Sequence, residues 1–475
     1  MLCFRLLVCC LLASPLAAWA QQPTQPTAPP LEKPQSKPQT EKPETVASAP
    51  QLTLAEAIRI GIENNYDVRL SQQDVRIAEN NVTRGNAGQL PTVAGNFTRT
   101  FNVNNTRQQR EQSNPVVING GRANALNTNV TANWTIFDGL GMFIAYDRLR
   151  ALEQSQRQLT RATMEETVAN IMDAYYAVVR EAGKINSLEE ALKIGQARID
   201  LTQARVDVGV AAKVEVLTAR VDYNADRSLL VQQQEVLKTA KVNLNNLLGR
   251  TPSIDFLPAD SIVVARTLDR TTVGQAIRQS NPRLQQAKIN TQVATFDRKL
   301  VRASRFPQVD LVGGYGLNRN INNAFLINTA TGSVLGSNVN RVYGPNYGVA
   351  ASVPIFDGFN RTRLEQNARI AEAQSRLALD QTRLQLDAEA EQAYAQYQNR
   401  LQLLELEEGN ILLARENVAI ALERYRLGLL TPLDLRVAQR TQLDAEVRLL
   451  DIRYQAKQAE IVLRRLSSGL VQQGE

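Results

Sequence analysis

The sequence predicts a membrane α+β protein built from two internal repeats, each with two strands followed by two very long helices. Three observations predict this class. The pentapeptide TIFDG at 135–139 returns as PIFDG at 354–358, which gives a repeat offset of 219 (355 − 136). The segments before each pentapeptide alternate apolar and polar residues, as strands do. The segments after it follow a seven-residue apolar repeat, as long packed helices do.

The N-terminal residues 1–20 are predicted to be a secretory signal peptide. Arg5 precedes an apolar run, and Ala18-Trp19-Ala20 has the small-x-small pattern of a cleavage site. A membrane anchor is the alternative, but the apolar run is too short to cross a bilayer. All three cysteines lie in this segment, at Cys3, Cys9 and Cys10. The mature chain is therefore expected to form no disulfide and no thiolate metal site.

The composition argues against catalysis. The chain has no histidine, so it lacks the usual general base and the commonest transition-metal ligand. We expect no enzyme activity, no cofactor and no metal. The formal net charge is +7, but basic and acidic residues are interspersed and form no basic stripe. Nucleic-acid binding is therefore not expected.

Residues 21–51 are predicted to be a flexible linker, because they are rich in proline and polar residues. The first repeat is predicted over 52–269 and the second over 270–475. Each begins with two short helices: Thr53 and Glu56 have capping-box spacing in the first, and Asn281-Pro282 separates the two helices in the second. The tripeptide AIR occurs at 57–59 and again at 276–278, with the same offset of 219 (276 − 57).

Two strands are predicted in each repeat, over about 92–105, 127–137, 308–318 and 345–356. Each is about ten residues long with one apolar and one small polar face, a pattern typical of transmembrane β-strands. A half-buried sheet in a soluble protein is the alternative. Arg99 falls on the apolar face and would have to lie near a headgroup region. The Asn-rich segments 104–127 and 318–341 are expected to be outward-facing loops.

Four long helices are predicted, over about 140–208, 213–249, 359–427 and 432–467. The first of them would be roughly 100 Å long at 1.5 Å per residue. Around 359–427 two apolar rows run along opposite flanks: one contains Ile370, Leu377 and Leu384, and the other contains Leu379, Leu386 and Ala393. Each helix should therefore contact neighbours on both sides, as in a cylinder of helices.

The number of strands predicts an oligomer. Four strands are too few to close a membrane barrel, and an open strand edge in lipid would leave backbone groups without partners. Three copies would supply 3 × 4 = 12 strands and continue into a cylinder of helices. Other multiples remain possible on these grounds.

The chain resembles the TolC family of outer-membrane efflux proteins over residues 52–470. The resemblance is carried by the duplication, the two IFDG junctions and two turn motifs, ARVDVGVAAKVEVLTAR at 204–220 and YRLGLLTPLDLRVAQ at 425–439. It implies a TolC-like homotrimer with a 12-stranded barrel in the outer membrane of a Gram-negative bacterium, and a long periplasmic α-helical barrel. It also implies contact with outer-membrane lipid, a periplasmic adaptor and an inner-membrane pump of the RND, ABC or MFS type.

The resemblance implies functions for the two turns between long helices. Tips that dock the adaptor would include Gly209, Val210, Ala211, Gly428, Leu429, Leu430 and Thr431. A periplasmic gate would include Glu215, Tyr425 and Asp434. Simple chain reversal at the glycines, a solvated helix charge at Asp434 or Glu215, and a helix contact at Tyr425 are the alternatives. Leu430 and Val437 depart from the family pattern, which has a gating arginine and a second aspartate there in some members.

The strand-to-helix junctions are expected to be structural, with Asp138 or Asp357 capping a long helix. They comprise Ile136, Phe137, Asp138, Gly139, Ile355, Phe356, Asp357 and Gly358. The leading functional hypothesis is a passive exit duct of a tripartite efflux or type I secretion system. A stand-alone diffusion porin and a structural coiled-coil trimer are the alternatives. The sequence does not identify the exported substrate.

Overall fold

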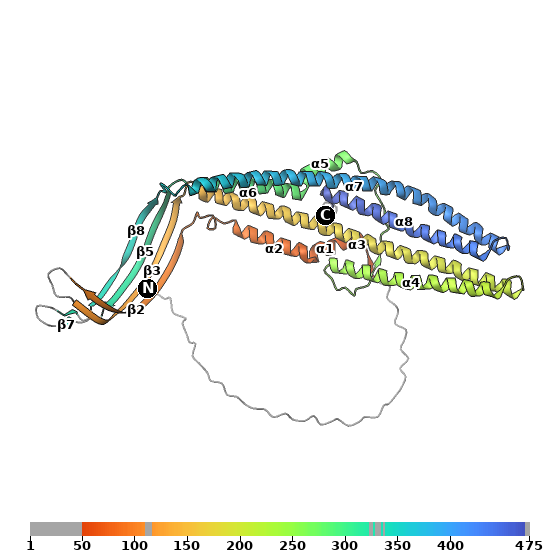
Figure 1. The fold of residues 1–475 in the computed structure, drawn as a ribbon, viewed down its shortest axis with the longest axis horizontal. Coiled ribbons are helices and arrows are strands. Elements are labelled where there is room, and N and C mark those ends of the chain that lie inside the picture. The colour runs from red at the N-terminus through yellow and green to blue at the C-terminus, as the bar shows by residue number, and fades with distance from the viewer. Residues whose placement is uncertain (1–49, 110–115, 323–325, 328–333, 336–337, 471–475) are drawn as a thin grey trace, which may run out of the picture. The chain divides into compact units, whose positions relative to one another are not determined.

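The computed structural model describes residues 50–109, 116–322, 326–327, 334–335 and 338–470, all within one compact unit, Ala49–Glu475. The predicted signal peptide and nearly all of the predicted linker lie outside the described residues. So do parts of the two Asn-rich segments. Figure 1 shows a sheet of long strands joined to a set of much longer helices.

Four long helices occur in two equal pairs. They are α3 (Gly141–Asp207), α4 (Lys213–Leu247), α7 (Asn360–Arg426) and α8 (Pro432–Leu466). Helices α3 and α7 have 67 residues each, and α4 and α8 have 35 each. Each boundary in the second pair has an offset of 219 from its equivalent in the first, for example 360 − 141 and 466 − 247. A helix of 67 residues is about 100 Å long, which matches the length that the sequence predicts.

The two apolar rows predicted on α7 have different surroundings. Leu386 and Ala393 are buried, with 3% and 4% of their surface exposed. They pack with Tyr397 and with Leu463 of α8. The other row remains exposed along its length, at Ile370, Leu377 and Leu384. No helix among the described residues is long and apolar enough to span a membrane.

Short helices precede each strand pair: α1 (Leu54–Asn64), α2 (Tyr66–Asn81), α5 (Arg270–Ser280) and α6 (Pro282–Ala303). The predicted cap at Thr53 is confirmed, because its hydroxyl accepts the backbone N–H of Glu56 at 3.2 Å. Asn65 caps α2 and donates its side-chain amide to the carbonyl of Leu247 at 2.9 Å. Asn281 caps α6 and donates to Leu466 at the same distance.

These two asparagines correct the register of the repeat. The offset between Asn65 and Asn281 is 216 (281 − 65), and both bounds of α5 have this same offset from those of α1. The AIR tripeptides, whose offset is 219, therefore occupy different positions in α1 and α5, so the prediction that they are equivalent residues of the two repeats is wrong. A cap fixes a helix start through specific hydrogen bonds, whereas three common helix residues can recur at any offset.

The strands form one antiparallel sheet in the order β2-β3-β5-β8. They span Thr92–Gln108 (β2), Val116–Phe137 (β3), Gln308–Asn322 (β5) and Asn338–Ser352 (β8). A two-residue strand β1 (Gln51–Leu52) pairs with β4 (Leu257–Pro258), and β6 (Leu326–Ile327) pairs with β7 (Val334–Leu335). Strands β2 and β8 are therefore the two edges of the four-stranded sheet.

The predicted loops begin too early. Asn124 pairs with Phe101 and with Ile321, so much of the Asn-rich segment 104–127 is strand. Ladder hydrogen bonds to neighbours on both sides override the low strand propensity of asparagine. The last predicted strand was also wrong at its end, because β8 stops at Ser352. Pro354 follows, and it has no N–H for the ladder.

One face of the edge strand β2 is apolar and open. Val93, Phe97, Phe101 and Val103 are between 67% and 71% exposed. Arg99 lies among them, with its guanidinium 4.8 Å from the centre of the Phe101 ring and its Nε donating to Asn124. In the described part of the chain this face carries large apolar side chains with no layer packed over it.

Candidate functional site

The turns that join the long helices have the same backbone. Gly209 has φ = +81° and Gly428 has φ = +76°, a conformation that favours glycine. The N–H of Val210 donates to Arg205 O and that of Gly209 to Val206 O, each at 2.9 Å. The second turn repeats this pair of bonds through Leu429 and Gly428. This is the Schellman motif, which satisfies the last carbonyls of a helix.

The turns lie at the end of the helices remote from the sheet (Figure 1), and they expose apolar side chains. Val210 is 65% exposed and Leu429 is 66% exposed. Ala211 and Leu430 are half-buried. Leu430 differs from the expectation for a docking residue, because it packs against the cluster that contains Tyr425 and Leu435. Thr431 is exposed and is the N-cap residue that precedes α8.

The two predicted gate carboxylates lie in the first turn of α4 and α8. The hydroxyl of Thr431 accepts the N–H of Asp434 at 3.2 Å and donates to its carboxylate at 2.6 Å. In the first hairpin Ala212 occupies the equivalent cap, and among the described residues Glu215 accepts only the Ala212 N–H, at 3.4 Å. Asp434 is exposed and Glu215 is half-buried. Both carboxylates therefore stabilise a helix start, and Asp434 also presents charge to solvent.

Tyr425 is fully buried between the hairpins. Its hydroxyl lies 2.7 Å from the Thr202 hydroxyl of α3. Thr202 in turn donates to the carbonyl of Arg198 at 2.7 Å. The Arg205 guanidinium lies 5.1 Å from the centre of the Tyr425 ring. The predicted gate residue is thus a contact between α3 and α7.

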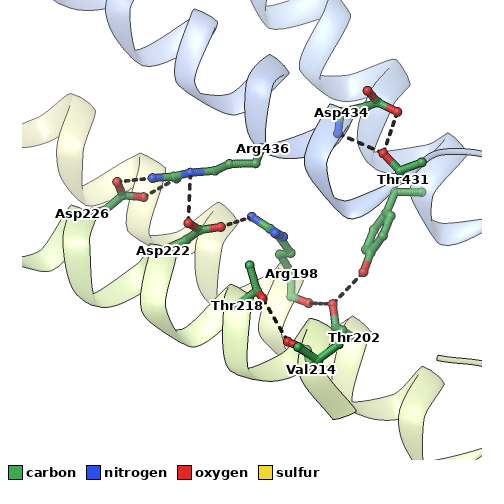
Figure 2. A network of polar contacts seen from close by, with 10 residues as sticks. Arg198, Thr202, Val214, Thr218, Asp222, Asp226, Thr431, Asp434 and Arg436 are labelled. Atoms are coloured by element: carbon green, nitrogen blue, oxygen red, sulfur yellow. Dashed lines mark hydrogen bonds and ion pairs between the residues drawn. The ribbon is translucent and has the colours of Figure 1, made fainter. Parts of the chain in front are cut away.

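A network of ion pairs further along the helices joins α3, α4 and α8 (Figure 2). Arg436 forms two parallel bonds to Asp226, at 2.6 and 2.8 Å. Its Nε lies 3.8 Å from Asp222, which also accepts a bond of 2.9 Å from Arg198. Asp226 and Arg198 are nearly inaccessible, at 4% and 3% exposed. The carboxylate of Asp226 raises the pKa of Arg436, and Asp222 adds to this effect.

This network is absent from the predictions made from the sequence, although the heptad pattern carries a signal for it. Asp226 follows Ala219 by seven residues, and both are buried on the same face of α4. A charged residue on a buried row requires a charged partner. The sequence cannot say which of the chain's many arginines supplies it, because Arg436 is far from Asp226 along the chain, at a separation of 210.

The strand-to-helix junctions have an unusual backbone in both repeats. Gly139 and Gly358 have positive φ, and so do the residues that follow them, Leu140 at +68° and Phe359 at +64°. Asp357 accepts the N–H of Arg361 at 2.9 Å, two residues into α7. The equivalent cap by Asp138 is absent: its Oδ1 is buried without a hydrogen-bond partner among the described residues.

The remaining junction residues differ in exposure. Ile136 and Phe137 end strand β3, at 45% and 37% exposed. Ile355 and Phe356 lie outside any strand and are 95% and 74% exposed. The second junction therefore presents more apolar surface than the first.

A comparison with protein families decides the kind of protein. The model described as "Outer membrane efflux protein" matches residues 58–250 and 273–469, one match in each repeat. The chain belongs to the outer membrane efflux protein family. The family resemblance and the outer-membrane location with a large periplasmic helical part, both expected from the sequence, are thereby confirmed. The family consists of channels, not enzymes.

Two curated relatives of this outer membrane efflux protein are CyaE of Bordetella pertussis and the outer membrane protein TolC of Vibrio cholerae. CyaE is 24% identical over 330 residues, which cover 68% of this chain and 64% of CyaE. TolC is 22% identical over 301 residues, which cover 61% of this chain and 62% of TolC. The chain therefore matches less than two thirds of either relative.

The solved structure of the outer-membrane channel OprN has the same fold as this efflux-family chain. The TM-score is 0.68 at 20% identity, and the alignment covers 88% of this chain and 90% of OprN.

No group of three or more Asp, Glu, His or Cys side chains that could hold a metal ion occurs in the described ranges. At the tips the chain presents exposed apolar side chains at Val210 and Leu429 and an exposed carboxylate at Asp434.

Proposed function

We propose that this protein is the exit duct of a tripartite efflux or type I secretion system. It carries substrates passively across the periplasm and outer membrane while docked to a periplasmic adaptor and an inner-membrane pump. The observation that carries the proposal is an antiparallel sheet with two open edges continuing into helices of about 100 Å. A stand-alone pore has no use for helices of that length.

Assembly as a homotrimer would satisfy two incomplete surfaces. Pairing of β2 in one copy with β8 in the next would close twelve strands into a barrel, leaving no edge in lipid. The exposed row at Ile370, Leu377 and Leu384 would pack against the neighbouring copy. Apolar residues in a regular row are normally covered in the working assembly.

Docking of the adaptor would use the two tips. Val210 and Leu429 are exposed apolar residues at structurally equivalent turns, and threefold symmetry would present six such turns in one ring. The mature chain is expected to contain no cysteine, so Val210→Cys and Leu429→Cys would each carry a unique thiol. Cross-linking in the native host should capture a periplasmic adaptor from both positions. Leu384→Cys, on the exposed row of α7, should capture only another copy of the chain.

Conductance separates the duct from a porin. The reconstituted protein should be mostly closed in planar bilayers when no partner is present. A large, permanently open conductance would instead favour a stand-alone porin. Loss of export or raised sensitivity to toxic compounds in a deletion strain should be restored by the wild-type gene; an unchanged phenotype in a host without a related duct would overturn the proposal.

The gate would lie near the tips, with Asp434 as its charged ring and the Arg436 network holding the hairpins together. Three copies of Asp434 would place three carboxylates around one opening, which attracts cations. Asp434→Ala should therefore weaken block by cationic inhibitors severalfold, measured as the blocker concentration that halves the conductance. Unchanged block would make Asp434 only a helix-capping charge.

A further inference from the structure

A basic patch lies on α6, on the turn that follows it and on α7, close to the sheet. We define it by six residues: Arg298, Lys299, Arg302, Arg305, Arg369 and Arg376. Helix α6 runs beside α7 toward the strands (Figure 1). The patch is not part of the tip, the gate or the strand pairing.

The basic patch carries more positive charge than its carboxylates neutralise. Glu372 binds Arg298 and Arg376, each at 2.9 Å. Glu365 binds Arg305 at 2.7 Å and Arg369 at 2.8 Å. Each carboxylate thus holds two guanidinium groups. The hydrogen bond from Arg369, together with the charge of Arg305, lowers the pKa of Glu365, so that carboxylate stays ionised.

The two other cations of the patch are less constrained. Lys299 and Arg302 are exposed and form no ion pair with any described residue, although the charge of Arg302 contributes to lowering the pKa of Glu365. The Lys299 ammonium lies 5.4 Å from the centre of the Phe296 ring. Six cations against two carboxylates leave the patch with a net charge of about +4, since each side chain carries one unit charge at neutral pH.

These two cations lie on the outer face of α6. Asn290 accepts a bond of 2.8 Å from Ser155 of α3 and lines a groove enclosed by α3, α6 and α7. Lys299 follows Asn290 by nine residues, which is about 180° around a helix. Arg302 lies three residues after Lys299 and shares its side of the helix, and α6 ends at Ala303, before Phe306. If the groove lines the tunnel, this side faces outward.

Lys299 and Arg302 are close to the start of β5, at the depth expected for lipid headgroups once the sheet is inserted, whereas Arg376 is 16 residues into α7, about 24 Å from its start. Phe306 is two residues before the start of β5 at Gln308 and is 52% exposed. Lys299 precedes the helix end by a few residues, about 6 Å along the axis at 1.5 Å per residue. The headgroup layer is about 5–8 Å thick on each side of the hydrocarbon. An exposed aromatic ring beside cations is typical of such an interface.

We propose that Lys299 and Arg302 of the basic patch bind the phosphodiester headgroups of anionic phospholipids in the periplasmic leaflet. This inference rests on the proposed insertion of the sheet into the outer membrane. Arg302 can donate two parallel bonds to a phosphate, and Lys299 can extend its ammonium along the surface to reach another. Bound headgroups would fix the depth of the duct in the bilayer from the periplasmic side.

The test uses the full-length assembled protein in phosphatidylethanolamine vesicles with or without phosphatidylglycerol. Lipid retained after gentle detergent extraction is identified by native mass spectrometry. Wild type should retain phosphatidylglycerol in preference to phosphatidylethanolamine. The double variant Lys299→Gln/Arg302→Gln should lose that preference by about fivefold for each cation removed.

The matched control is Arg227→Gln/Lys238→Gln on α4, which removes two exposed cations away from the strands. It should retain the wild-type preference. An equal loss in both double variants, or no preference in inserted wild type, would overturn the inference while leaving the duct intact. Failure of wild type to insert into the vesicles at all would overturn the proposed function as well.

Discussion

The two helical hairpins have the same backbone and different polar contacts. Helices α3 and α4 match α7 and α8 in length, and both turns end on a glycine with positive φ. The polar residues that connect the two hairpins are not duplicated. With the offset of 219, the positions of Arg198, Asp222 and Asp226 are occupied in the second hairpin by Asn417, Thr441 and Ala445. The position of Arg436 is occupied in the first by Leu217.

This difference shows where a duplicated protein became asymmetric. Backbone length and turn geometry must agree for two hairpins to lie side by side, so both copies keep them. A contact between the two hairpins of one chain needs complementary residues, because two identical surfaces of like charge would repel each other. The first hairpin supplies Asp222 and Asp226, and the second supplies Arg436. Specific attachment between the hairpins therefore comes from the residues that differ.

The largest expected effect is at the buried ion pair. Asp226→Asn removes the charge that pairs with Arg436 and should lower the free energy of unfolding by about 3 kcal/mol, since Asp222 remains as a weaker partner. Thermal unfolding of the purified protein measures this change. The same variant should raise the open probability in planar bilayers, because α8 loses its main attachment to α4.

Two variants sharpen this test. Asp380→Asn removes an exposed carboxylate of α7 and should leave both measurements unchanged. The double variant Asp226→Ala/Arg436→Leu installs the residues that the other hairpin uses at these positions, Ala445 and Leu217. It should recover most of the stability, because replacing a whole buried pair is tolerated better than breaking it. A stable double variant with a wild-type closed state would disprove the role of the pair in gating.

The long helices could be predicted closely because their signal is regular. A row of apolar residues every seven positions continues for many turns, and glycine marks each end. The strand ends were predicted less well. Asn124 has low strand propensity, yet it pairs on both sides within the sheet. Whether such residues lie in a strand depends on pairing between distant segments, and a single sequence does not show that pairing.

The candidate site could be predicted only in part for the same reason. The glycine turns are local features, and the structure has them at the predicted residues. The partner of Tyr425 is Thr202, far away in the sequence. Leu430 illustrates the limit, because exposure was expected at a turn and the structure packs this side chain against Tyr425 and Leu435. Local sequence predicts where the chain reverses direction. It does not predict which side chains at the turn pack against the neighbouring helices.

The turns offer a test in which the two hairpins should behave alike. Gly209→Ala and Gly428→Ala place a Cβ at φ = +81° and +76°, which costs roughly 1–2 kcal/mol of stability for each. No described atom lies closer than 3.9 Å to either added Cβ, so the cost is in the backbone. Gly409→Ala, in an exposed turn of α7, should instead stabilise by about 0.5 kcal/mol. Unequal losses at the two turns would show that one tip is strained by its surroundings.

A smaller effect is expected at the contact between α3 and α7. Tyr425→Phe removes the hydroxyl that bonds Thr202 at 2.7 Å and should cost about 1 kcal/mol. Thr202→Val should cost a similar amount, and the double variant should cost less than the sum, because both remove one bond. Tyr66→Phe, at an exposed tyrosine, is the control and should have no effect. Additive losses would mean that the two hydroxyls act independently.

The smallest effect concerns the helix caps, where the second hairpin has a hydrogen bond that the first lacks. Thr431 accepts the N–H of Asp434, so Thr431→Ala should cost about 1 kcal/mol. Ala212 has an extended backbone, with φ = −84° and ψ = 143°, close to that of Thr431. Ala212→Ser should therefore gain about 0.5 kcal/mol. Thr431→Ser keeps the acceptor and should be nearly neutral in thermal unfolding. A loss of stability in Ala212→Ser would show that the hydrogen bond from Ala212 to Glu215 already stabilises the start of α4. The starts of α4 and α8 would then be stabilised by different hydrogen bonds.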